Sequence, residues 1–142
     1  MERASRAHAR AVSAEMHSGF IALRDELPQN LRQRRPLLFE ALSDTCRNQV
    51  QRIQNIWQDC YQRYGGPWLF GEFSIADVMY APVALRFRSY HIPLNSEAAA
   101  FRNGIEGLPS VQRFVVAAEA EKESLPFVDA LIPQANNPLT LG

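Results

Sequence analysis

The stretch from Gly66 to Val78 constrains the fold most, because it carries two independent signals for the start of a helix. Ser74 is a residue type favoured at the N-cap position of a helix. Asp77 stands three positions later, where its carboxylate can accept a hydrogen bond from the backbone amide of the cap. This pattern is a capping box with Asp in the place of Glu. Phe73 before the cap and Val78 at the fourth helical position fit the hydrophobic staple of such boxes, so the sequence predicts a helix that begins at residue 74.

The predicted helix, about residues 74–90, is apolar on almost every side, although Pro82 lies inside it. A helix that is hydrophobic all round is expected in the middle of a domain. Apolar residues spaced by three and four predict four more helices, at about 3–27, 36–64, 96–105 and 110–123. No segment alternates as a strand does. We therefore expect an all-α domain of five helices over residues 1–125, with an irregular tail at 126–142.

The apolar positions indicate which helix faces turn inward. The stripe of the first predicted helix is formed by Val12, Met16, Phe20, Leu23 and Leu27. When each residue is placed 100° further around the helix, the neighbouring face is polar and basic. This face holds Arg6, Arg10, Ser13, His17 and Arg24. The second predicted helix carries a stripe from Leu38 to Tyr64. In the last one, Val111, Phe114, Val115 and Ala118 are expected to face the core.

Composition restricts the classes of function. The 142 residues are 46% hydrophobic and 21% charged, which suits one soluble domain. The formal net charge is zero, so nothing indicates a nucleic-acid partner. No apolar run is long enough for a membrane span, and no secretory signal is recognisable, so we expect a cytoplasmic protein.

The cysteines and histidines predict neither a disulfide nor a metal site. Cys46 and Cys60 fall on one predicted helix, about 21 Å apart along its axis, which is too far for a bridge. We expect both to be buried thiols. The three histidines have no ligating companions at useful spacing.

Two motifs resemble the glutathione S-transferase family. The stretch Trp68-Leu69-Phe70-Gly71-Glu72-Phe73-Ser74-Ile75-Ala76-Asp77 is similar to the aromatic-x-x-Gly-x-x-Ser/Thr-x-Ala-Asp pattern of its C-terminal domain. The stretch Ala14-Glu15-Met16-His17-Ser18-Gly19-Phe20 resembles the Glu-Leu-His-Lys-Gly-Phe segment of bacterial, beta-class-like enzymes. Gly107-Leu108-Pro109-Ser110-Val111 also fits the opening of a late helix in that family. The resemblance implies an orthogonal bundle of five helices.

The resemblance also implies a function. Family enzymes bind glutathione in a thioredoxin-like domain that activates its thiol, and residues 1–142 contain no segment similar to that domain. With such a domain, the chain would form the electrophile site and a homodimer through its first two helices. Glutathione would be the co-substrate and a small hydrophobic electrophile the substrate. We expect the chain alone to bind no cofactor and to be inactive.

The implied site residues lie on the first and third predicted helices. His17 matches the family histidine that faces the glutathione sulfur, although Ser18 replaces the Lys beside it. The substrate-binding candidates are Ser13, Phe20 and Tyr90, and Arg6 and Arg10 would contact glutathione or a neighbouring subunit. Ser74, Asp77, Phe73 and Val78 are interpreted as structural.

Simpler interpretations remain open at this point. His17 can instead be a solvent-facing or interface residue, and the arginines can form a solvated helix face. The alternative functions are a non-catalytic helical module for protein interaction, or an inactive, truncated remnant of an enzyme.

Overall fold

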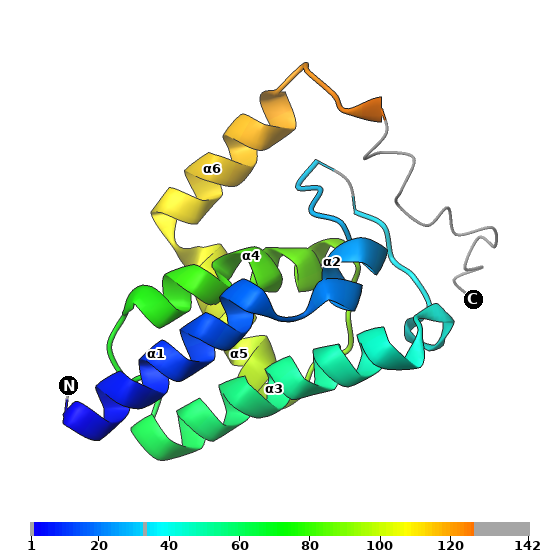
Figure 1. Cartoon of the computed structure of the whole chain (residues 1–142). Coiled ribbons are helices and arrows are strands. Elements are labelled where there is room, and N and C mark those ends of the chain that lie inside the picture. Colours follow the sequence, from blue (N-terminus) through cyan, green and yellow to red (C-terminus); the bar gives the residue numbers. More distant parts are fainter. Residues whose placement is uncertain (1, 33, 127–142) are drawn as a thin grey trace.

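The computed structural model describes residues 2–32 and 34–126, and this part of the chain is built from helices (Figure 1). The elements are α1 (Arg3–Ser18), α2 (Ile21–Glu26), the 3-10 turn η1 (Phe39–Ala41), α3 (Asp44–Tyr64), α4 (Ile75–Ser89), α5 (Ser96–Gly107) and α6 (Pro109–Ala120). The all-α prediction is confirmed over these residues. The predicted irregular tail lies outside them, apart from Pro126.

The first predicted helix is two helices, so the single helix expected over 3–27 was wrong. The chain breaks at Phe20, whose φ of 59° lies in the left-handed region and cannot continue α1. Arg24 Nη2 bridges the break, because it donates to the carbonyl oxygens of Met16 at 2.5 Å and His17 at 3.0 Å. The predicted apolar stripe still points inward, since Val12, Leu23 and Leu27 are at most 4% exposed.

Helix α3 begins at Asp44, eight residues later than the predicted start at Pro36. Ser43 is its N-cap, since the Ser43 hydroxyl oxygen accepts a hydrogen bond from the amide of Cys46 at 3.1 Å. Glu26 at the end of α2 accepts from the backbone amide of Ser43 at 2.9 Å and from its hydroxyl, which ties the two helices together. Leu38 lies before the helix and is 53% exposed, so its expected place in the apolar stripe was also wrong.

Helix α4 passes through the middle of the bundle and packs against α1 and α5 (Figure 1). Its side chains Tyr80 and Phe87 surround Trp57 of α3, at ring-centroid distances of 5.8 and 5.6 Å. Burial is not complete, however. Ile75 and Val78 in the first turns of α4 are 67% and 48% exposed, which corrects the expectation that this helix is covered on every side.

Helix α6 stands at the edge of the bundle and rises away from it (Figure 1). Val115 is its one buried residue among those described, and Phe114 is 59% exposed. The prediction that Phe114 faces the core was therefore wrong. Asn95 begins α5 by accepting from the amide of Ala98 at 2.8 Å.

Cys46 and Cys60 are unpaired and fully buried on α3, as predicted. Burial raises the pKa of the Cys46 thiol to about 11 and that of Cys60 to about 12. Both are core residues rather than nucleophiles.

No described helix is long and apolar enough to cross a bilayer.

Candidate functional site

The predicted capping box is present at the start of α4. Asp77 is fully buried, and its Oδ2 accepts from the backbone amide of Ser74 at 2.7 Å and from the Ser74 hydroxyl at 2.9 Å. Its Oδ1 accepts from the amide of Leu69 at 2.9 Å. Asp77 thus joins the preceding turn to α4 in addition to capping the helix. Phe73 is 49% exposed and packs edge-on against Trp68 at 5.0 Å.

The polar face of α1 carries the residues that sequence analysis selected. His17 lies exposed in the last turn of α1, and Arg6 and Arg10 are exposed on the same helix. Ser13 is half-buried, with a buried hydroxyl oxygen that has no hydrogen-bond partner among the described residues. Arg24 belongs to α2, so its predicted place on this face was wrong.

Phe20 and Tyr90 do not line an open site. Phe20 is 7% exposed and belongs to the core cluster. Tyr90 is 2% exposed, and its hydroxyl donates to the carbonyl oxygen of Pro28 at 2.8 Å. Their apolar surface is already used in packing, so their predicted role in substrate binding is corrected to a structural one.

A set of contacts that the sequence did not reveal holds residues 27–30 against the end of α4. Arg86 is 8% exposed, and its Nε donates to the carbonyl oxygen of Leu27 at 2.5 Å. Burial lowers the pKa of this guanidinium to about 10. The Ser89 hydroxyl donates to the carbonyl oxygen of Asn30 at 3.0 Å. Tyr90 completes this clamp, which positions the loop that faces α6.

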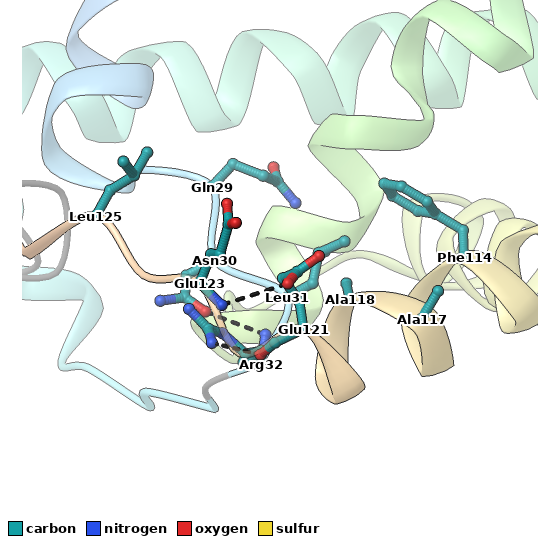
Figure 2. Close-up of a pocket in the computed structure, with 10 residues that line it drawn as sticks. All are labelled: Gln29, Asn30, Leu31, Arg32, Phe114, Ala117, Ala118, Glu121, Glu123 and Leu125. Carbon is teal, nitrogen blue, oxygen red and sulfur yellow. Dashed lines mark hydrogen bonds between the residues drawn. The ribbon is translucent and has the colours of Figure 1, made fainter.

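The clamped loop and α6 enclose an open groove, called here the α6 groove (Figure 2). Its outer part has a volume of about 520 Å³ and is bordered by residues 29–32, Phe114, Ala117, Ala118, Glu121, Glu123 and Leu125. Its inner part, of about 460 Å³, is bordered by Gln29, Leu31, Val78, Ala81, Pro82, Leu85, Ser110, Val111 and Phe114. Gln29, Leu31 and Phe114 are common to both parts. Arg32 closes one side, because its Nη1 donates to the carbonyl oxygen of Glu121 at 2.8 Å.

Residues 2–32 and 34–126 contain no cluster of three His, Cys, Asp or Glu side chains that could hold a metal ion. Among the described residues, the polar face of α1 carries exposed basic and imidazole groups, and α4 exposes apolar residues in its first turns.

Comparison with known proteins identifies the family. The model of the family described as "Glutathione S-transferase, C-terminal domain" matches residues 6–117, and the chain belongs to this family. The match extends from α1 into α6 and so includes both the capping box and the polar face of α1. No curated protein and no solved structure matched the chain. The similarity to beta-class enzymes stays a prediction.

Proposed function

We propose that the chain supplies the electrophile site and the dimer contacts of a glutathione transferase, and that a thioredoxin-like domain outside residues 1–142 binds the glutathione. Membership of the C-terminal-domain family is the observation that carries this proposal. Within the described residues 2–32 and 34–126 there are only isolated β-bridges and no sheet. In this proposal the glutathione-binding fold therefore comes from another segment or another chain.

The surface formed by α1 and α4 is the best candidate for the contact with that domain. The two helices are held together at their centres, since the Tyr80 hydroxyl donates to the carbonyl oxygen of Val12 at 3.0 Å. Helix α4 exposes Ile75 in its first turn, whereas the half-exposed Val78 borders the α6 groove. Exposed apolar residues of this size at a helix edge favour contact with a further protein surface.

The polar side chains of α1 suit an anionic thiol substrate. Arg6 and Arg10 can pair with carboxylates through charge-assisted hydrogen bonds. The His17 imidazole can donate a hydrogen bond to a thiolate sulfur and stabilise its negative charge. In the proposed reaction the thiolate sulfur attacks an electrophilic carbon, a carbon–sulfur bond forms, and the leaving group departs with its electron pair. The thiol proton goes to a base in the glutathione-binding domain or to solvent.

The experiment compares the 142-residue chain with a fusion that carries a glutathione-binding thioredoxin-like domain ahead of Met1. We expect the chain alone neither to bind glutathione resin nor to conjugate an aryl halide, and the fusion to do both. His17→Gln in the fusion should lower kcat/KM by about 10²-fold, as for the loss of one donor to developing charge.

His91→Asn is the matched control, because His91 is also exposed but lies beyond the far end of α4. A fusion that binds glutathione yet shows no turnover would contradict the enzymatic proposal and favour a non-catalytic interaction module. Turnover by the unfused chain would contradict the need for a second domain.

Homodimerisation is proposed through α1, α2 and α3. Ile21 at the start of α2 is 64% exposed, and among the described residues it is the exposed large apolar residue of these three helices. Sedimentation should show a dimer that Ile21→Arg weakens, and a monomer at every concentration would contradict this part of the proposal.

A further inference from the structure

The α6 groove is apolar along most of its length and is open in the described part of the chain. Its inner wall consists of Val78, Ala81, Pro82 and Leu85 of α4. Phe114 forms the opposite wall and remains 59% exposed. An aromatic ring this exposed on a helix with a single buried residue gains stability when another apolar segment covers it.

A buried polar atom in the groove indicates what kind of segment fits. The Gln29 side-chain oxygen is inaccessible to solvent and has no hydrogen-bond partner among the described residues. A buried acceptor of this kind destabilises the fold when it is unpaired. Figure 2 shows Gln29 projecting from its loop on the same side as Phe114. A backbone N–H is a suitable donor, and a rotation of the half-buried Gln29 side chain would bring this oxygen within reach of an extended peptide between the apolar walls.

The path of the chain points to the peptide. Leu125 already borders the groove, and the described part ends one residue later. The next residues, 127–132, read Phe-Val-Asp-Ala-Leu-Ile, whereas residues 133–142 are rich in Pro, Asn and other non-aliphatic types. Six extended residues reach about 20 Å, which matches the length of about 18 Å for the 12-residue helix α6.

We propose that residues 127–132 dock in the α6 groove of the same chain, cover Phe114 with their apolar side chains and donate a backbone hydrogen bond to Gln29. Covalent attachment favours this occupant over a free ligand, because a short linker holds the segment at a high effective concentration. The inference does not depend on the glutathione chemistry proposed above.

The test uses the full chain with methyl groups labelled for NMR. In the double variant Leu131→Asp with Ile132→Asp, we expect the methyl signals of Leu31 and Val111 to shift, because the charged segment leaves the groove. A dye that binds apolar surfaces should also bind more strongly. Val50 of α3 is fully buried outside the groove and should keep its methyl shift.

The matched control is the double variant Leu139→Asp with Leu141→Asp, which adds the same charge beyond the proposed segment. It should leave the groove signals unchanged. The proposal is overturned when both double variants give the spectrum of the parent chain. It is also overturned when the effect of Leu131→Asp with Ile132→Asp disappears on dilution, because a second copy is then the occupant.

Discussion

Replacing Asp77 by Ala tests how much one buried carboxylate contributes to this fold. The side chain is fully buried and accepts hydrogen bonds from the amide of Leu69, the amide of Ser74 and the hydroxyl of Ser74. Asp77→Ala removes all of these at once. The turn before α4 then loses its attachment to the helix, although the apolar face of α4 is unchanged.

The expected cost follows from the groups left behind. The amide of Leu69 belongs to a fully buried residue and keeps no replacement acceptor, whereas Ser74 is half-buried and water can reach its groups. Hydrogen bonds to a charged group contribute about 1.5–3 kcal/mol each, and an unpaired buried donor costs about 1–3 kcal/mol. Allowing for water at Ser74, we expect Asp77→Ala to lower the free energy of unfolding by about 3–5 kcal/mol, at the upper end for a single substitution. Ser74→Ala removes only the cap side chain and should cost about 1 kcal/mol.

Urea unfolding followed by circular dichroism measures this difference, provided that the slope with denaturant stays constant. Glu72→Ala is the matched control, because Glu72 is an exposed carboxylate in the same turn. It should change the free energy of unfolding by less than about 0.5 kcal/mol. If Asp77→Ala and Glu72→Ala have the same small effect, the argument that Asp77 joins the turn to α4 is refuted.

Two further predictions concern the backbone and the buried thiols. Gly71 has a φ of 82°, and an added Cβ would lie 3.1 Å from the carbonyl oxygen of Tyr64, so Gly71→Ala should lower the free energy of unfolding in urea by about 1–2 kcal/mol. Gly107 has open space around it, so Gly107→Ala should leave the free energy of unfolding unchanged. Equal decreases for the two variants would contradict this prediction. Because burial raises the pKa of Cys46 and Cys60 above the ordinary value of 9.0, their contribution to stability is complete well below pH 9 and is lost as the pH rises through 9 toward 11 and 12. The free energy of unfolding should therefore fall between pH 8.5 and 10, by at most about 1.4 kcal/mol per pH unit for each thiol. In a variant with Ala at both positions, the free energy of unfolding should fall less over this pH range. Identical pH profiles for the two proteins would contradict the prediction.

The parts of the fold that sequence analysis predicted correctly depend on neighbouring residues. The capping box needs only Ser74 and Asp77, three positions apart, and the structure confirms it. The burial of Cys46, Trp57 and Cys60 follows from the apolar period of one long helix. Such patterns are visible in the sequence because the interacting groups are brought together by the helix itself.

The errors have a common physical cause. The break at Phe20 places a bulky residue in the left-handed backbone region. The conformational preference of Phe disfavours this region, but packing of the ring in the core stabilises it. The start of α3 at Ser43 is supported by Glu26 from another helix, and no local pattern contains that contact. Both were predicted as continuous helix because the apolar period continues across them.

The candidate site shows the same division. Periodicity identified the polar face of α1 with Arg6, Arg10 and His17, and these residues are exposed in the structure. Tyr90 was a candidate from its place at the end of the third predicted helix, but its hydroxyl donates to the carbonyl oxygen of Pro28. The clamp formed with Arg86 and Ser89 joins residues about sixty positions apart, so its partners could not be read from spacing.

The sequence by itself determined the helical class, the exact start of α4 and the family, because each depends on short-range patterns of polar and apolar residues. Only the tertiary structure decided where α1 ends, which face of α6 is covered and how residues 27–30 are held. These features depend on contacts between distant segments, whose energies outweigh the local preferences of the chain. The α6 groove and the exposed edge of α4 belong to this second group, and they are the surfaces on which the proposals for this protein depend.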